Sequence, residues 1–287
     1  MTALIDIHTH PVQIAELYPD DENLERAVKD VFGLYMEPQP VETYFAQLDE
    51  AGIDKAVLLP IDCTSAHGCR VVSNQQVAWL MERSSRLIGF ASVDPNDPAA
   101  AETLGRDVRE YGLKGLKLDP SLQRFDLGDR DKAFPVYAAC VELGIPLLVH
   151  CGLSWAPRGL AGLANPLGLE EAIQEFPALR FILAHFGWPW VGEALMLALK
   201  HENVYLDTSI LYSGTPTESL RHVLADVVGL DVLDQGLRGR VLFGSNYPRV
   251  DPKRVAHALR QLGLEPKLER RILHDNAATL LNLEEPQ

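Results

Sequence analysis

The sequence predicts an α/β fold, a (β/α)8 (TIM) barrel formed by one domain over residues 1–287, from three observations. Eight short runs are apolar at almost every position, which is typical of parallel strands covered on both faces. Longer amphipathic segments follow most of these runs, as the helices of such a barrel do. Polar residues also recur at the same end of these runs. The runs are residues 4–9, 55–61, 87–93, 113–118, 145–150, 180–185, 203–208 and 240–245.

Breaker residues mark the ends of the predicted helices. Residues 41–52 and 131–144 each stop at a glycine, which is favoured after a helix C-terminus. Residues 252–263 start at a proline and stop at a glycine. A doubly wound open sheet is the main competitor, but no glycine-rich phosphate loop follows the first run, so we favour the barrel.

Residues 11–38 interrupt this alternation with a long acidic segment directly after the first strand. Long loops at the active end of a barrel often act as lids, so we expect a lid-like insertion. A surface excursion that contains one short helix is the alternative.

Charge and composition exclude several classes of partner. The formal charge of -14 disfavours nucleic acid and anionic membranes, since both would repel the chain. No run reaches the ~18 apolar residues of a membrane span, and the N-terminus lacks a signal-peptide pattern. We therefore expect a cytoplasmic protein that acts on a small molecule. The four cysteines do not form a disulfide framework, although Cys63 and Cys69 share a loop and could pair under oxidation.

The polar residues at the strand ends predict where chemistry takes place. Active sites of this fold lie at the C-terminal ends of the strands and in the loops that follow. A helical repeat or a sandwich gives no reason for polar residues to stand at matching ends. The residues in question are Asp6, His8, His10, Lys117, Asp119, His150, His185, Asp207 and Asn246.

Four of the nine histidines stand at strand ends. Successive strand residues face opposite ways, so His8 and His10 share a face, together with Asp6. Two adjacent imidazoles form a pair that can bind a divalent metal. His150 and His185 each end a separate strand and strengthen this interpretation. Histidines in polar, helix-like segments, such as His257, are expected at the surface.

An ordered set of motifs supports the same conclusion. The motifs "DIHTHP", "GLKGLKLDP", "GIPLLVHCG", "FILAHFGWPW", "NVYLDTS" and "LFGSNYP" run from about residue 4 to residue 283. Together they resemble the amidohydrolase superfamily, in the amidohydrolase-related (amidohydrolase 2) branch. That branch contains aminocarboxymuconate semialdehyde decarboxylase, γ-resorcylate decarboxylase and related lactonases. The resemblance implies a barrel independently of the strand count.

The resemblance also implies roles for individual residues. In that branch, His8, His10 and His150 would bind one divalent metal ion, most often zinc. His185 would lie beside the metal and activate water or handle a proton. The family usually has an aspartate at the end of strand eight, in a motif that reads GSDYP or GTDWP. This sequence has Asn246 at that position.

An amide at this position limits the proton chemistry. Asn246 has no titratable proton near neutral pH, so it cannot act as a general base and is expected to orient water or substrate. Zinc held by three neutral imidazoles can still lower the pKa of bound water to ~7. His185 is the first candidate for proton transfer, and Asp119 is the second, because many relatives read KLHP where this chain reads KLDP. An ion pair of Asp119 with Lys117 is an equal alternative.

The expected substrate contacts are Trp155, Arg158, Lys117 and Arg249, which follow strands at the same end. Arginines suit a carboxylate and aromatic rings suit a planar body. The expected function is a metal-dependent hydrolase of a small carboxylate-bearing or lactone substrate. A non-oxidative decarboxylase (lyase) of an aromatic or unsaturated acid is the first alternative, and a binding protein attenuated by Asn246 is the second. Barrels of this branch are often dimers, so a homodimer is one of the expected oligomeric states.

Overall fold

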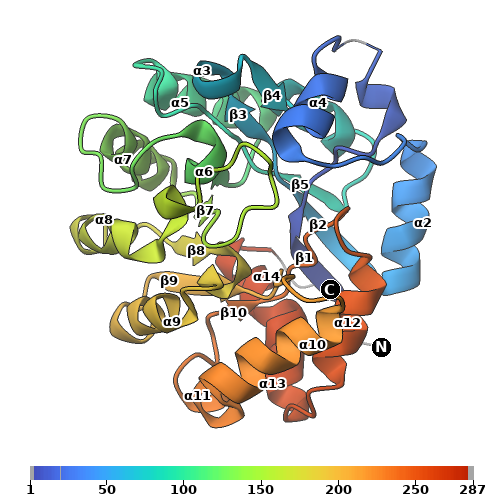
Figure 1. The fold of residues 1–287 in the computed structure, drawn as a ribbon, viewed down its shortest axis with the longest axis vertical. Coiled ribbons are helices and arrows are strands. Elements are labelled where there is room, and N and C mark those ends of the chain that lie inside the picture. The colour runs from blue at the N-terminus through green and yellow to red at the C-terminus, as the bar shows by residue number, and fades with distance from the viewer. Residues whose placement is uncertain (1–2, 20, 284–287) are drawn as a thin grey trace.

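The computed structural model describes residues 3–19 and 21–283, and eight parallel strands lie at its centre with helices around them (Figure 1). The eight apolar runs are therefore confirmed as strands, although most of the strands are shorter than predicted. The strands are β1 (Leu4–Thr9), β2 (Ile53–Leu58), β5 (Leu87–Gly89), β6 (Leu116–Leu118), β7 (Leu147–Val149), β8 (Phe181–Leu183), β9 (Val204–Asp207) and β10 (Val241–Leu242).

Hydrogen bonds close these strands into a barrel. Two parallel sheets, ordered β1-β2-β5 and β10-β9-β8-β7-β6, supply most of the wall. Parallel bridges join them at both edges, between Ala91 and Leu116 and between Thr9 and Tyr247. The C-terminal ends of all eight strands therefore meet at one mouth, as the sequence predicts.

Helices cover the outside of the wall. The predicted helices over residues 41–52 and 131–144 are confirmed, and each ends at a left-handed glycine, with φ of 72° at Gly52 and 66° at Gly144. The third predicted helix ends earlier, at Arg260. The longer helices are α2 (Val41–Ala51), α4 (Asn74–Met81), α5 (Ala100–Tyr111), α7 (Ala133–Leu143), α9 (Val191–Lys200) and α12 (Pro252–Arg260). The shorter ones are α1 (Leu24–Arg26), α3 (Thr64–His67), α6 (Pro120–Gln123), α8 (Glu170–Glu175), α10 (Pro216–Leu220), α11 (Leu230–Gln235), α13 (Pro266–Arg270) and α14 (Asn276–Leu280).

Two apolar cores hold this architecture together. The larger one lies between the strands and the helices. The smaller one contains alternate residues of single strands, such as Ile88 and Phe90 near β5, and includes Leu280 of α14. Alternation of this kind separates the inner from the outer face of a barrel wall. None of the described helices combines the length and apolarity needed to cross a membrane.

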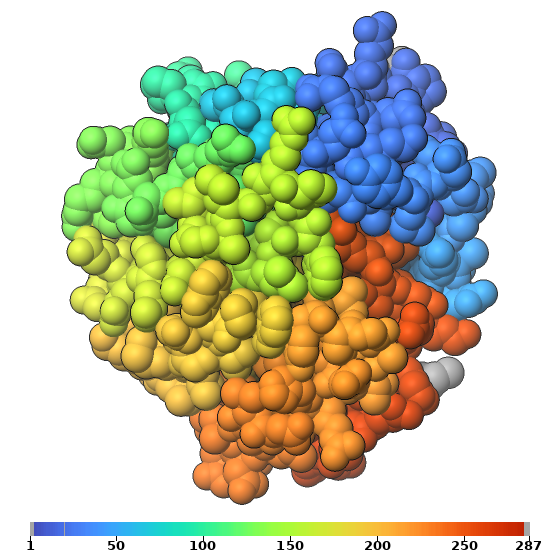
Figure 2. Space-filling model, viewed as in Figure 1, coloured from blue at the N-terminus to red at the C-terminus, as the bar shows by residue number. Residues whose placement is uncertain are grey.

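The insertion after β1 is partly helical and well packed. It contains α1 and a π-helix, η2 (Ala27–Phe32), and most of its apolar side chains are buried, with Tyr35 and Met36 as exposed exceptions. Space-filling atoms of this segment lie against the loops at the barrel mouth (Figure 2).

One element was not expected from the sequence. An antiparallel hairpin, β3 (Ile61–Cys63) and β4 (Cys69–Val71), follows β2, with α3 between its strands. Its strands have three residues each, too few for a visible alternation of apolar and polar positions.

Candidate active site

The strand-end histidines converge at the mouth of the barrel. The Nε2 atoms of His8 and His10 are 3.3 Å apart. His150 Nδ1 lies 3.0 Å from His185 Nε2, and the rings of His8 and His185 are 4.8 Å apart. Four imidazoles from three strands thus form one buried cluster, as predicted.

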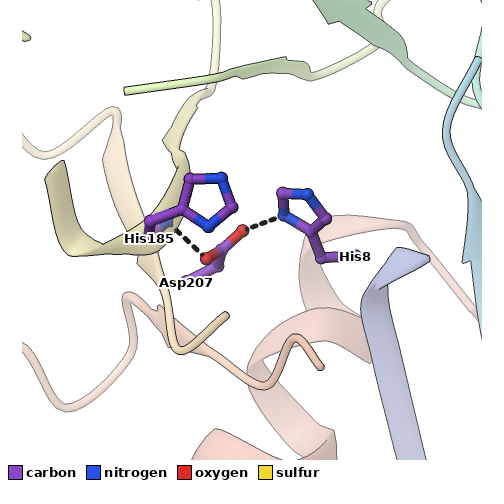
Figure 3. A group of neighbouring side chains, drawn as sticks. All are labelled: His8, His185 and Asp207. Atoms are coloured by element: carbon purple, nitrogen blue, oxygen red, sulfur yellow. Dashed lines mark hydrogen bonds and ion pairs between the residues drawn. The ribbon is translucent and has the colours of Figure 1, made fainter. Parts of the chain in front are cut away.

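Asp207 at the end of β9 orients two of these rings. Its Oδ2 lies 2.7 Å from His8 Nδ1, and its Oδ1 accepts the backbone N–H of His185 at 2.8 Å (Figure 3). Oδ1 also accepts the backbone N–H of Ser209 at 3.0 Å. A carboxylate cannot donate a proton to His8, so Nδ1 of His8 carries the hydrogen and Nε2 is left with a lone pair.

His10 has the same tautomer for a similar reason. Its Nδ1 lies 2.8 Å from the carbonyl oxygen of Leu59, which can only accept a hydrogen bond. Two Nε2 lone pairs, on His8 and His10, therefore face each other at 3.3 Å. This contact is repulsive unless a proton or a cation lies between the two nitrogens.

His150 supplies a third lone pair. His185 Nδ1 donates to the carbonyl oxygen of Ser209 at 2.8 Å, so its Nε2 accepts from His150 Nδ1. The remaining nitrogen of His150, Nε2, is buried without a hydrogen-bond partner among the described residues. A buried acceptor with no partner is costly, and a metal ion is one way to satisfy it.

Three ligand atoms lie within 4.8 Å of one another in one group of the described residues, His8, His185 and Asp207 (Figure 3). This His-His-Asp group could hold a divalent ion. The structure places the predicted ligand His150 beside His185 instead of in that group. Asp207 is one of the strand-end residues that the sequence singles out, whereas Ser209 was not predicted as a site residue. The "DTS" motif at a strand end is the signal that could have found it, since Ser209 Oγ contacts His185 Nδ1 at 2.8 Å.

Burial keeps the imidazoles neutral. It lowers the pKa of His8, His10 and His185 well below the usual value, and it lowers the pKa of His150 to about 3. The nearby charge of Lys117 lowers all four further. Neutral imidazole is the form that binds a metal.

Lys117 is itself unusual, because its side chain is buried and its Nζ has no partner among the described residues. Burial lowers the pKa of Lys117, and the charge of Asp119 partly offsets this. Asp119 is the N-cap of α6, where its Oδ1 accepts the backbone N–H of Leu122 at 3.0 Å. No ion pair within 4.0 Å joins Lys117 and Asp119 in the described part of the chain, so Asp119 has a capping role that was not predicted.

Two glycines allow the backbone to approach this cluster. A Cβ on Gly244 would lie 2.9 Å from the Cβ of His8, and a Cβ on Gly152 would lie 2.0 Å from the carbonyl oxygen of Trp188. Gly152 also has a φ of 93°, which L-residues rarely adopt. The glycines in "FGS" and "HCG" are therefore required by the close approach of neighbouring loops.

Asn246 lies in the left-handed region, with φ of 65°. Asparagine and aspartate tolerate this region better than most residues do. Its backbone N–H donates to the carbonyl oxygen of His8 at 3.0 Å, which fixes it beside the metal-binding candidates. Its side-chain amide forms no hydrogen bond within the described ranges and lines the cavity at the mouth. The amide is therefore available to a ligand.

The cavity is narrow, about 30 Å³, and an adjoining hollow shares Leu153, Trp155, His185 and Asn246 with it. Arg158 is exposed and does not line it, whereas the other predicted contacts do. Trp155 lines the cavity but is half-exposed, and its Nε1 donates to the carbonyl oxygen of Leu211 at 2.9 Å. The site residues that line the cavity are His10, Lys117, Asp119, His150, Trp155, His185, Asn246 and Arg249.

The insertion after β1 covers this cavity. Phe32 lines it, and its ring lies 5.0 Å from the ring of His10. Arg249 donates to the carbonyl oxygens of Phe32 and Gly33, the latter at 3.4 Å, and its guanidinium lies 4.4 Å from the ring of Phe32. The segment therefore occupies the place of a lid, and Arg249 attaches it to the end of β10.

Comparison with known proteins agrees with this architecture. Residues 5–283 match the model of the family described as Amidohydrolase. A stretch of 81 residues, 28% of this chain, is 31% identical to protein FluG of Emericella nidulans. The match covers only 9% of that protein.

Solved structures share the fold. An uncharacterised TIM-barrel protein from Bordetella bronchiseptica is 23% identical, with 98% of each chain covered and a TM-score of 0.77. A putative 2-pyrone-4,6-dicarboxylic acid hydrolase from Pseudomonas putida is 19% identical, with 100% of each chain covered and a TM-score of 0.71. The 5-carboxyvanillate decarboxylase from Sphingomonas paucimobilis is 18% identical, with 99% of this chain and 100% of that chain covered and a TM-score of 0.66. At these identities the likeness establishes the fold.

Proposed function

The chain belongs to the amidohydrolase family, a family of enzymes, and on this premise we propose that it is a metal-dependent hydrolase. The observation that carries the proposal is the 3.3 Å separation of His8 Nε2 and His10 Nε2. Both rings bind acceptors through Nδ1, so neither can relieve the contact by moving its proton without losing a hydrogen bond. A cation held by both nitrogens would resolve it.

We assign the metal to His8, His10 and His150, whose Nε2 lone pairs lack a donor in the described part of the chain. The donor set fits the ion, because neutral imidazoles suit zinc and related divalent metals. Asp207 would keep its hydrogen bond to His8 and orient that ring from behind. Zinc is the ion that we propose. When bound, it would supply a water of lowered pKa and polarise the bond to be broken.

His185 is the residue that we propose for proton transfer. Its Nδ1 is fixed as the donor to Ser209, so its Nε2 is the basic nitrogen. Burial lowers the pKa of His185, which keeps Nε2 free of a proton at neutral pH. Asn246, beside it at the cavity wall, holds water or substrate by hydrogen bonds and cannot take the proton.

The charge of the cavity favours an anionic substrate. Lys117 and Arg249 line it against a single carboxylate, that of Asp119. The Lys117 ammonium group is buried without a partner among residues 3–19 and 21–283, and a substrate carboxylate would satisfy it. We therefore propose a small carboxylate-bearing or lactone substrate. The net charge of -14 supports a small molecule as the binding partner, since nucleic acid and anionic membranes would repel the chain.

Asn246 favours a second candidate, non-oxidative decarboxylation of an aromatic or unsaturated acid. Loss of carbon dioxide requires the enzyme to hold the substrate carboxylate. It does not require a carboxylate at position 246 to deprotonate a water molecule. Trp155, Trp188 and Tyr212 border the site and would suit a planar body, and the last two are stacked at 4.1 Å.

Metal removal and a substrate panel test both candidates. The full chain is treated with a chelator, restored with zinc, and assayed with lactones, amides and aromatic acids. Zinc-dependent turnover of a lactone or an amide supports the hydrolase, and zinc-dependent release of carbon dioxide supports the decarboxylase. Activity that survives in metal-free protein overturns both.

A matched pair of lysine variants tests the assigned carboxylate contact. Lys117→Met should raise KM for carboxylate-bearing substrates, whereas Lys114→Met, at an exposed position on the same segment, should leave KM unchanged. Equal effects of the two variants on KM would show that Lys117 does not contact the substrate carboxylate.

A further inference from the structure

The β3–β4 hairpin places two cysteines directly opposite each other. Cys63 and Cys69 are Cα partners in the antiparallel pair, and the Sγ of Cys63 lies 3.3 Å from the carbonyl oxygen of Cys69. Opposed residues of an antiparallel pair have Cα atoms about 4.5 or 5.5 Å apart. Both values lie within the roughly 4.4–6.8 Å range of disulfides. The two thiols can therefore be bridged without moving the strands apart.

The two thiols differ in access and acidity. Cys69 is 5% exposed and lines a polar cavity of about 410 Å³ together with Asp62 and Arg70, whereas Cys63 has no exposed surface. The thiol of Cys63 donates toward Cys69 and lowers the pKa of Cys69, and Arg26 nearby lowers it further. Cys69 is thus the thiol that an external reagent can reach as a thiolate.

The other two cysteines provide an internal comparison. Cys140 on α7 and Cys151 after β7 are both buried, and burial raises the pKa of each thiol well above its usual value. Neither is paired with another cysteine in a described strand ladder. Their thiols are expected to be inert.

We propose that Cys63 and Cys69 form a redox modification site, which closes to a reversible disulfide by exchange with a low-molecular-weight disulfide such as glutathione disulfide. The Cys69 thiolate attacks one sulfur of glutathione disulfide, forms a mixed disulfide and releases one glutathione thiolate. The Cys63 thiol then attacks the sulfur of Cys69, and its proton passes to the departing glutathione sulfur. The second glutathione leaves as a thiol, so the protein gives up two electrons and two protons, and glutathione disulfide takes up both electrons.

Hydrogen bonds connect the hairpin to the catalytic cavity. The cysteine pair is nevertheless a second site, in addition to the proposed hydrolase site. Gln123 Nε2 donates to the carbonyl oxygen of Asp62, and Gln123 Oε1 accepts the backbone N–H of Asp119, each at 2.7 Å. A disulfide between Cys63 and Cys69 would fix the strand that carries Asp62. Through Gln123, the disulfide would also restrict the movement of Asp119 at the cavity wall.

Thiol counting and peptide mapping test the proposal on the full chain. The protein is incubated with glutathione disulfide, quenched in acid and unfolded, and its free thiols are titrated. We expect a fall from the four thiols of the chain to two. Both cysteines lie on one tryptic peptide, residues 56–70, which should become lighter by two hydrogen atoms and return to its original mass with dithiothreitol. Four remaining thiols, or oxidation at Cys140 or Cys151, would overturn the proposal.

Two serine variants test the order of the steps. Cys63→Ser removes the resolving thiol, so we expect glutathione to stay attached to Cys69. Cys69→Ser removes the accessible thiol, so we expect Cys63 to stay unmodified. The reverse pattern would overturn the assignment of Cys69 as the attacking thiol. The peptide map of the unsubstituted chain keeps the site itself testable if either variant does not fold.

Discussion

The Nδ1 atom of His8 lies 2.7 Å from Oδ2 of Asp207, across 199 positions of the sequence. This contact sets the tautomer of His8, because the carboxylate accepts the Nδ1 proton and leaves the Nε2 lone pair beside His10. It links β1 to β9 across the barrel mouth and makes His8 able to bind a metal.

Asp207→Asn should therefore weaken metal binding. An amide NH2 group at the Oδ2 position would favour the His8 tautomer with its hydrogen on Nε2, which cannot bind a metal. We expect zinc affinity to fall by about 10- to 100-fold in a competition titration with a chromophoric chelator. Asp234→Asn, on a partly exposed carboxylate that pairs with Arg238, is the matched control. Equal affinities of the two variants would contradict the orienting role of Asp207.

Asn246→Asp should have the opposite effect. The backbone at this position has φ of 65°, which aspartate tolerates about as well as asparagine, so the substitution adds charge without added strain. An anionic oxygen beside three neutral imidazoles should raise zinc affinity by on the order of tenfold. The same titration measures it. Asn246→Ser serves as the uncharged comparison, and a gain for serine as large as that for aspartate would show that charge is not the cause.

Arg249→Met should loosen the insertion that covers the site. The variant leaves the carbonyl oxygens of Phe32 and Gly33 without their donor, at a cost of about 1–3 kcal/mol of stability. We expect faster hydrogen exchange in residues 24–34, with the barrel strands unchanged. The exposed Arg254→Met is the control. Exchange that accelerates equally in insertion and strands would contradict a local attachment.

Asp6 should make the stability of the metal-free protein depend on pH. Burial raises the pKa of Asp6 to about 7, although hydrogen bonds from Ser245 and His8 oppose the shift. The unfolded carboxyl group has a pKa of about 3.9. Folding therefore binds a proton in this interval, so the contribution of Asp6 is fully present below about pH 4 and is lost as the pH rises to about 7.

This loss can be measured by urea unfolding. The free energy of unfolding should decrease by about 2 to 3 kcal/mol between about pH 5 and about pH 8 because of Asp6. Asp6→Asn should remove that part of the pH dependence, since an amide oxygen can still accept the backbone N–H groups but does not titrate. The same pH dependence in both proteins would contradict the raised pKa.

The barrel could be predicted from sequence because its signal is repeated. Eight apolar runs report the same environment, and glycines such as Gly52 and Gly144 end helices by local backbone geometry. The predicted strands were too long because apolar residues continue beyond the last hydrogen bond of the ladder. The run over residues 240–245, for example, contains a strand of two residues, Val241–Leu242. Hydrophobicity reports burial and does not mark where strand pairing stops.

The candidate site was predictable in its residues but not in its contacts. The positions of His8, His10, His150 and His185 followed from strand ends. The sequence could not show that Asp6 bonds backbone N–H groups of His8 and Ser245 instead of joining the imidazoles, because this depends on register between distant strands.

Arg249 shows a second limit of the same kind. Its charge predicted a substrate contact, and it does line the cavity. Its N–H groups nevertheless donate to the carbonyl oxygens of Phe32 and Gly33, more than 200 positions away in the sequence. Only the folded chain brings the insertion and the end of β10 together.

The metal content of the full chain, purified without chelator, tests the central claim most directly. Elemental analysis should find about one divalent ion per chain, and His10→Gln should abolish it. The surface variant His257→Gln should retain the ion, since His257 is exposed on α12. A chain that holds no divalent ion, and takes up zinc no more tightly than its His10→Gln variant, would contradict the account.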